Sequence, residues 1–165
     1  MFIHCTDKVA IMAATRCGHT NMYNYFGVRA YSGTGFTWKN WKEHHNSIVV
    51  LRNPLDRVVS ALPWLNLPAA DTNFFVTHSS PYMNNMLIGC NFRIIDFYDL
   101  EQYIPRTGLQ SYRTNSNVGE CTAEEVHVEN TGYTLVELQR EVEIYREFMT
   151  TKERVTPEEW KEMTQ

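Results

Sequence analysis

The stretch "VVLRNPLDRVVSAL", residues 49–62, joins two patterns at one corner. It begins with a short apolar run rich in β-branched residues, which is typical of a buried strand. Asn53 and Pro54 then favour the start of a helix, because an Asn side chain caps the first turn and Pro suits the first helical position. The stretch therefore predicts a strand that passes directly into a helix, with Arg52 at the end of the strand and Ser60 on the helix.

Strand and helix patterns alternate in the same way upstream of this corner. Short apolar runs are separated by segments of helical character, and Gly27 is a normal helix stop. Such alternation is typical of β-α-β units around a parallel sheet, so we expect an α/β fold. In chain order, the expected elements are a strand at Val9–Ala13, a helix at 19–26, a strand at Val28–Tyr31, a helix at 37–45 and a strand at Ile48–Leu51.

Downstream of the corner the alternation is looser. Pro63 and Pro68 predict a long surface loop. Ser80 followed by Pro81 then predicts a short helix that ends at Gly89. We therefore expect fewer regular elements here than in the upstream part.

Three further elements are expected toward the C-terminus. Residues 92–97 predict a fourth strand, which runs into a short helix capped by Asp99. Thr156-Pro157-Glu158-Glu159 is a capping box that opens a last short helix. Between them, an apolar stripe at helical spacing predicts one long helix, for which packing on the sheet is favoured over a dimer seam. The residues of the stripe are Leu135, Leu138, Val142, Tyr145 and Met149.

The length and composition predict one domain with its own core. The chain has 165 residues, of which 43% are hydrophobic, so it can bury a core without metal or disulfide support. The four cysteines show neither metal-ligand spacing nor a Cys-x-x-C pair, which favours reduced thiols. The apolar run Val9–Ala14 is too short for a signal peptide, and no run reaches the roughly 20 apolar residues of a membrane helix. We therefore expect a cytoplasmic protein with no membrane partner and no metal.

The charges are unevenly distributed along the chain. The formal net charge of −4 argues against a nucleic-acid partner. Residues 1–119 carry ten Lys and Arg against seven Asp and Glu, a net charge of +3, whereas residues 120–165 carry five against twelve, a net charge of −7. We expect a single domain over 1–165, with a binding core in 1–119 and C-terminal helices in 133–164 whose acidic residues form a solvated face.

A second informative stretch is "ATRCGHTNM", residues 14–22, which follows the first expected strand. A strand, a short Gly-containing loop and a helix start together bind phosphate well, because free backbone N–H groups converge there and the helix dipole favours an anion. The stretch lacks the first Gly and the Lys-Ser/Thr end of the G-x-x-x-x-G-K-[ST] pattern. By itself it fits an ordinary strand-to-helix turn equally well.

The two stretches together resemble the sulfotransferase family. "LRNPLDRVVSAL" is similar to the family's 3′-phosphate-binding segment, which has an Arg at a strand end, Pro two residues on and Ser eight residues after the Arg. "ATRCGHTNM" is similar to the 5′-phosphosulfate loop of the carbohydrate sulfotransferase branch, where a Lys-x-x-x-Thr-Asn segment follows the first strand. The resemblance covers residues 1–62 well, is loose as far as residue 119 and is absent beyond it.

The resemblance implies a function and a set of site residues. It implies a three-layer P-loop-like fold, with a mainly parallel central sheet flanked by helices, that transfers a sulfuryl group from 3′-phosphoadenosine 5′-phosphosulfate (PAPS) to a hydroxyl. The acceptor would be a carbohydrate or a small molecule, and adenosine 3′,5′-bisphosphate (PAP) the product. On this basis Arg52 and Ser60 bind the 3′-phosphate, and Arg16 is both catalytic and phosphosulfate-binding. The other implied phosphosulfate-binding residues are Cys17, Gly18, His19, Thr20 and Asn21.

The general base is not assigned by these motifs. Glu43, His44 and His45 precede the third strand, so we expect them at the amino edge of the sheet, away from the site. His78 is the candidate base or acceptor-binding residue, since an unperturbed His pKa of about 6.5 suits proton transfer. Arg113 lies in a polar segment and is expected to close over the 3′-phosphate, as a late basic loop does in the family.

Two alternatives to an active sulfotransferase stay open. Arg16 stands where the family has Lys, and a guanidinium with a pKa above about 12 is a poor proton donor. A catalytically impaired PAPS- or PAP-binding module of the same fold therefore fits the sequence too. A P-loop kinase of small molecules is less favoured, because no Lys-Ser/Thr pair or Mg²⁺-binding carboxylate at a strand end is evident. The chain is expected to be a monomer or a homodimer formed through the C-terminal helix.

Overall fold

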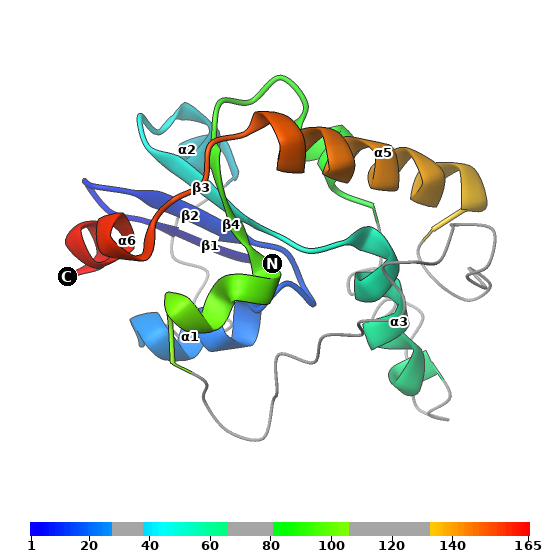
Figure 1. Ribbon diagram of the computed structural model, residues 1–165, viewed down its shortest axis with the longest axis horizontal. Helices are drawn as coiled ribbons and strands as arrows, with labels where there is room; N and C mark the ends of the chain where they lie inside the picture. Colours follow the sequence, from blue (N-terminus) through cyan, green and yellow to red (C-terminus); the bar gives the residue numbers. More distant parts are fainter. Residues whose placement is uncertain (28–37, 66–80, 106–132) are drawn as a thin grey trace. The chain divides into compact units, whose positions relative to one another are not determined.

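The computed structural model describes residues 1–27, 38–65, 81–105 and 133–165 (Figure 1). The chain forms two compact units. Unit 1 comprises Met1–Leu51, Cys90–Arg113 and Lys152–Gln165, and unit 2 comprises Arg52–Gly89 and Thr114–Thr151. The boundary between Leu51 and Arg52 falls inside the strand-to-helix corner of residues 49–62.

Unit 1 contains a four-stranded mixed sheet in the order β1-β2-β3-β4 (Figure 1). β1 pairs with β2 in antiparallel orientation, whereas β2, β3 and β4 are parallel to one another. The described part of unit 1 is therefore an α/β structure, and the strands predicted near residues 9, 48 and 92 are confirmed. The expected strand Val28–Tyr31 lies outside the described residues. The strands are Phe2–Cys5 (β1), Ala10–Ala13 (β2), Ser47–Leu51 (β3) and Arg93–Asp96 (β4).

β1 was not predicted from the sequence. Its Phe2 pairs with Ala13, and a tight turn in which the Thr6 amide donates to the Val9 carbonyl at 2.8 Å leads into β2. The strand is short, and its only long apolar side chains stand side by side at its start, so it shows no alternation of apolar and polar residues. Pairing with the buried β2, rather than a pattern of its own, holds it in the sheet.

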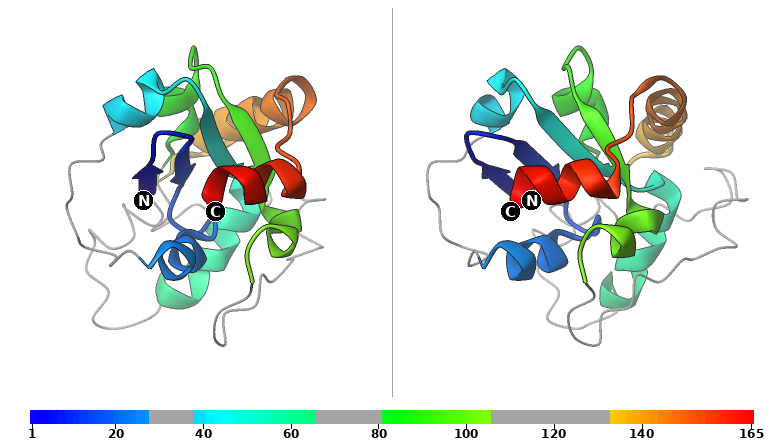
Figure 2. Two further views of the ribbon diagram at one scale, coloured as in Figure 1. Left: turned by 90° about the vertical axis from the view of Figure 1, so that its left-hand side faces the viewer. Right: turned by 60° about the vertical axis from the view of Figure 1, so that its left-hand side comes forward.

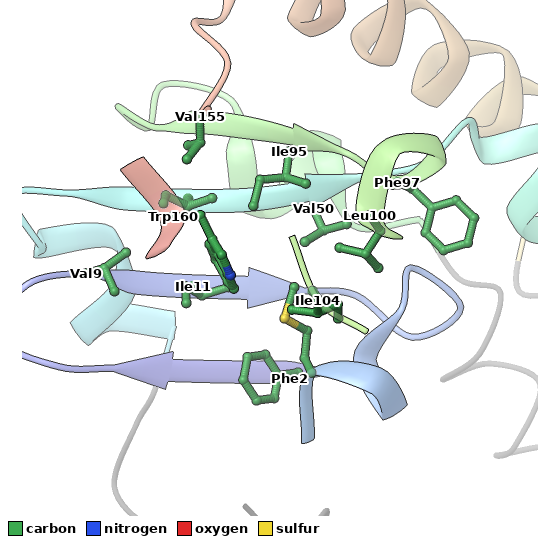
Figure 3. Packing of buried hydrophobic residues seen from close by; sticks show 13 residues of the cluster. Phe2, Val9, Ile11, Val50, Ile95, Phe97, Leu100, Ile104, Val155 and Trp160 are labelled. Atoms are coloured by element: carbon green, nitrogen blue, oxygen red, sulfur yellow. The ribbon is translucent and has the colours of Figure 1, made fainter. Parts of the chain in front are cut away.

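Alternate residues of the strands form the core of unit 1 (Figure 3). Ile11 of β2, Val50 of β3 and Ile95 of β4 lie on one face, and Trp160 of the C-terminal helix packs over them with no exposed surface. The residues between them along the strands, such as Met12 and Val49, are also fully buried. Burial on both faces explains why these strands read as continuous apolar runs.

The described residues of unit 1 include the helical segments α1 (His19–Phe26), α2 (Trp38–Glu43), the 3₁₀ helix η2 (Phe97–Gln102) and α6 (Pro157–Thr164). α1 ends as predicted at Gly27, whose φ of 65° is left-handed. α6 begins with the predicted capping box between Thr156 and Glu159, and it lies against the sheet in both views of Figure 2. The prediction that Asp99 caps the helix after β4 is wrong, since the Asp96 carboxylate accepts the Tyr98 amide instead.

Unit 2 contains α3 (Pro54–Leu65), the π-helical turn η1 (Met83–Leu87) and α5 (Leu135–Thr151). α3 begins as predicted, with the Asn53 side chain accepting the Leu55 amide at 2.9 Å. It continues through Pro63, where the sequence predicted a loop. The loop expected beyond Leu65 lies outside the described residues.

α5 buries a different stripe from the one predicted. Leu138 and Val142 are buried as expected and pack with Leu55 and Val58 of α3. Leu135, however, is 37% exposed, and the stripe includes Glu141, which is 1% exposed. The helix is thus turned so that a carboxylate faces the interior of unit 2. None of the helices in the described ranges is long and apolar enough to cross a lipid bilayer.

Candidate functional site

The loop after β2 has an unusual backbone. The Cys17 amide donates to the Ala14 carbonyl at 2.9 Å, and both Arg16, with φ of 69°, and Gly18, with φ of 82°, are left-handed. A left-handed conformation costs a residue other than Gly roughly 1–2 kcal/mol. Strain of this kind persists where the surroundings enforce it, often at ligand sites. The backbone of this loop thus differs from that of an ordinary strand-to-helix turn, and its role in binding phosphosulfate stays a prediction.

Gly18 is required by contact as well as by conformation. A Cβ atom built on it would lie 2.5 Å from Leu100 Cδ2, and Leu100 has no exposed surface. The loop is thus pressed against η2, and α1 begins at the next residue, with the Met22 amide donating to the Gly18 carbonyl at 3.1 Å. This contact fixes where the first amides of α1 stand relative to the end of β2.

The predicted phosphosulfate residues differ in accessibility. Cys17 is completely buried and Asn21 is 5% exposed, so neither side chain offers much surface to a ligand. Arg16, His19 and Thr20 are half-buried. The Arg16 Nε and Nη2 atoms are themselves buried, so a ligand at this loop would meet chiefly the His19 and Thr20 side chains and backbone N–H groups at the start of α1.

The second corner lies at the start of unit 2. Arg52, 5% exposed, follows the last residue of β3, and Ser60 is half-buried on α3 about two helical turns further on. The Ser60 hydroxyl donates to the Arg57 carbonyl at 2.7 Å. A hydroxyl that donates to a phosphate must give up this bond, so anion binding here requires the Ser60 side chain to rotate.

Arg57, which lies on α3 between Arg52 and Ser60 in the chain, is held by aromatic residues. It is 2% exposed, its Nη1 donates to the Tyr133 hydroxyl at 3.0 Å, and its Cζ lies 5.0 Å from the centroid of the Tyr82 ring. Such cation–π contacts gain strength when they are shielded from water. Arg57 therefore ties α3 to the residues that precede η1 and α5, which supports a structural role.

Glu141 lies at the other end of this cluster. Its carboxylate accepts the Met83 amide at 3.1 Å and the Asn84 amide at 2.9 Å, and so caps η1 from α5. The predicted cap, Ser80, lies outside the described residues. Burial raises the pKa of the Glu141 carboxyl, against the lowering effects of these amides and of the Arg57 charge.

The carboxyl edge of the sheet carries a carboxylate at a strand end, Asp96 of β4, which was not expected from the sequence. Burial raises the pKa of Asp96, and its hydrogen bond to the Tyr98 amide acts in the opposite direction. At the amino edge, the His44 ring bonds to the Thr6 carbonyl at 2.8 Å, and Thr6 lies in the turn that precedes β2. The expectation that His44 lies near the amino edge is therefore confirmed.

The predicted site residues fall into three groups. Arg16 to Asn21 belong to unit 1, whereas Arg52 and Ser60 belong to unit 2. His78 and Arg113 lie outside the described residues. No group of three or more His, Cys, Asp and Glu side chains that could hold a metal ion occurs in the described ranges.

Sequence reasoning missed the contribution of Tyr82, Tyr133 and Glu141. Glu141 carries a signal that was available, since it lies three residues after Leu138 and next to Val142, within the apolar stripe of α5. A carboxylate in such a stripe points to a buried polar contact. Comparison with models of protein families, with curated proteins and with solved structures gave no match.

Proposed function

We propose that the protein binds PAPS and transfers its sulfuryl group to a hydroxyl of a carbohydrate or a small molecule. The observation that carries the proposal is the loop between β2 and α1, which has two left-handed residues, Arg16 and Gly18. Gly18 is also pressed against Leu100, and α1 begins at the next residue. Backbone N–H groups in this arrangement favour an oxyanion such as phosphosulfate. The three-layer P-loop-like fold is part of this proposal.

The second support is the corner after β3. Arg52 and Ser60 combine a planar cationic fork with a hydroxyl, a pair suited to a phosphate monoester. The helix start between them is capped by Asn53, so the first turn of α3 is well defined. A nucleotide with separate 3′-phosphate and 5′-phosphosulfate groups fits a chain that has an anion-binding pattern at each of two strand-to-helix corners.

The sulfuryl transfer is a direct displacement that forms no covalent bond to the protein. The acceptor oxygen attacks sulfur in line, the bond between sulfur and the bridging oxygen breaks, and PAP leaves with that oxygen. The acceptor proton passes to a base, for which His78 is the candidate. Arg16 would stabilise the negative charge that builds on the phosphate side of the breaking bond, which is the main demand of such a displacement.

A second candidate function is binding of PAP or PAPS without transfer. The observation that favours it is Arg16 itself, which stands where the family has Lys, because Arg can hold an anion firmly but gives up a proton poorly. The same nucleotide would bind at the same residues. The two candidates differ only in whether labelled sulfate reaches an acceptor.

Incubation with radiolabelled PAPS and a panel of glycans and small alcohols tests the proposal. We expect label in at least one acceptor, and Arg16→Ala should lower the rate by about 10²–10³-fold, as loss of a charge-stabilising donor does. Lys39→Ala, which removes an exposed cation of the same unit, is the matched control and should leave the rate unchanged. Tight PAP binding without turnover would favour the binding module. Failure to bind either PAP or PAPS would contradict both candidate functions.

A further inference from the structure

The interior of unit 2 holds a polar cluster that the proposed function does not use. We call it the Arg57 cluster; it consists of Arg57 on α3, Tyr82 before η1, Tyr133 before α5 and Glu141 on α5. Arg57 is 2% exposed and Glu141 is 1% exposed. Burying charged groups is costly unless they are well paired, and apolar replacements are often as stable, so such clusters are kept where they fix one arrangement.

The cluster includes a residue of the first turns of α3, between Arg52, which precedes the helix, and Ser60, which lies on it. Arg57 lies between Arg52 and Ser60 in the chain, and its backbone carbonyl accepts the Ser60 hydroxyl at 2.7 Å, a bond that Ser60 gives up when it donates to a phosphate. Its amide donates to the Asn53 carbonyl at 3.0 Å, within the capped first turn. Any rotation of α3 about its axis that moved Arg57 would therefore also move Ser60.

Arg57 is in turn fixed from two directions. The Tyr133 hydroxyl accepts its Nη1 at 3.0 Å, and the Tyr82 ring lies 5.0 Å from its Cζ. Glu141 holds the residues beside Tyr82 in place, because its carboxylate accepts the amides of Met83 and Asn84. Glu141 thus acts on Arg57 both through its charge and through the position of the Tyr82 ring.

We propose that Arg57 and Glu141 are positioning residues that orient Arg52 and Ser60 toward the 3′-phosphate of the nucleotide. This inference rests on the proposed function and deepens it, because it assigns selectivity for the 3′-phosphate to the Arg57 cluster as well as to the two ligands. Neither Arg57 nor Glu141 touches the nucleotide in this account.

The test compares PAP with adenosine 5′-monophosphate, which lacks only the 3′-phosphate, by calorimetric titration at a temperature where each variant is folded. The ratio of the two affinities measures 3′-phosphate recognition alone. We expect wild type to prefer PAP, and Arg57→Lys and Glu141→Gln to lower the ratio by about tenfold, the effect of losing one hydrogen bond to a charged group. A purely structural role would lower the melting temperature and leave the ratio unchanged.

Tyr133→Phe keeps the test decisive if the other variants do not fold, because it removes only the hydroxyl that accepts Arg57 Nη1. Its matched control is Tyr25→Phe, which removes a partly buried hydroxyl from unit 1 that hydrogen-bonds to Thr164. Glu143→Gln, exposed on the same helix as Glu141, controls for the charge. Both controls should keep the wild-type ratio.

The outcomes distinguish failure of the proposed function from failure of the positioning role of Arg57 and Glu141. A wild type with no preference for PAP overturns the proposed function and this inference with it. A wild type that prefers PAP, together with folded Tyr133→Phe and Arg57→Lys variants that keep the full preference, overturns the inference alone. A lowered ratio in these variants, with unchanged controls, supports it.

Discussion

The interiors of the two units differ in chemistry. Unit 1 buries an apolar cluster, and its buried polar side chains among the described residues are uncharged. Unit 2 buries all four charged residues that are buried in the described ranges, which are Arg52, Asp56, Arg57 and Glu141. Apolar burial stabilises a fold without requiring exact polar geometry, whereas buried charges cost stability and specify an arrangement. We conclude that apolar packing stabilises the interior of unit 1, whereas buried charged side chains specify the arrangement of the interior of unit 2.

The largest expected effect concerns the apolar core of unit 1. Trp160→Ala removes a side chain with no exposed surface and should lower the free energy of unfolding by about 3–5 kcal/mol. Glu162→Ala, an exposed change on the same helix, should alter it by less than about 0.5 kcal/mol. Urea denaturation of the two variants makes the comparison. A loss below about 1 kcal/mol for Trp160→Ala would mean that α6 is not part of the core.

The next effect concerns the loop that carries Arg16. Gly18→Ala places a Cβ against the buried Leu100 side chain and should lose roughly 2–4 kcal/mol, from left-handed strain together with overpacking. Gly27→Ala is the matched control, because Gly27 is also left-handed but has no atom within 4 Å of an added Cβ. It should lose only about 1–2 kcal/mol. Equal losses in the two variants would show that the contact with Leu100 does not hold the loop.

The smallest effects are pH dependences of opposite sign in the two units. Burial raises the pKa of Glu141 above its ordinary 4.5, so the folded state binds this proton more tightly than the unfolded state. The stability that Glu141 contributes is therefore fully present below about pH 4.5 and is lost as the pH rises through the raised pKa. The hydrogen bond from the Thr156 amide, followed by contacts with Arg93, lowers the pKa of Glu159. Its contribution is present above about pH 4.5 and is lost as the pH falls through the lowered value.

Urea denaturation of wild type, Glu141→Gln and Glu159→Gln at a series of pH values below and above about 4.5 measures both pH dependences. The quantity compared is the free energy of unfolding of each variant minus that of wild type. The advantage of wild type over Glu141→Gln should shrink with rising pH, and its advantage over Glu159→Gln should shrink with falling pH. Two differences with the same sign of slope would contradict the contrast between a buried carboxylate in unit 2 and a capping carboxylate in unit 1.

The sequence predicts the elements of unit 1 better than those of unit 2. Continuous apolar runs and standard caps identify β2, β3, α1 and α6, because these features depend on residues that are close in the chain. β1 was not predicted, because its place in the sheet depends on pairing with β2. The orientation of α5 was missed because it depends on the Met83 and Asn84 amides, which donate to the Glu141 carboxylate from more than fifty residues away in the chain.

In the candidate site, too, the features that depend on neighbouring residues were predictable and those that depend on distant residues were not. The left-handed Arg16 and the buried Cys17 side chain were not inferred from "ATRCGHTNM". The close approach of Gly18 to Leu100 of η2 was not inferred either, because η2 is distant in sequence. The cap at Asn53 and the helix start at Pro54 were predictable, because they are local. The roles of Arg52 and Ser60 as phosphate ligands stay predictions.

Thermal stabilisation by PAP compared with Mg²⁺-ATP tests the central claim most directly. A ligand at about 100 times its dissociation constant stabilises the folded state by about 2.7 kcal/mol. We expect PAP to raise the melting temperature of wild type well above the effect of Mg²⁺-ATP, and Arg52→Ala and Ser60→Ala to remove most of that difference. Arg140→Ala, exposed in the same unit, should keep it. Equal stabilisation by the two nucleotides, or a full difference retained in both variants, would contradict the account.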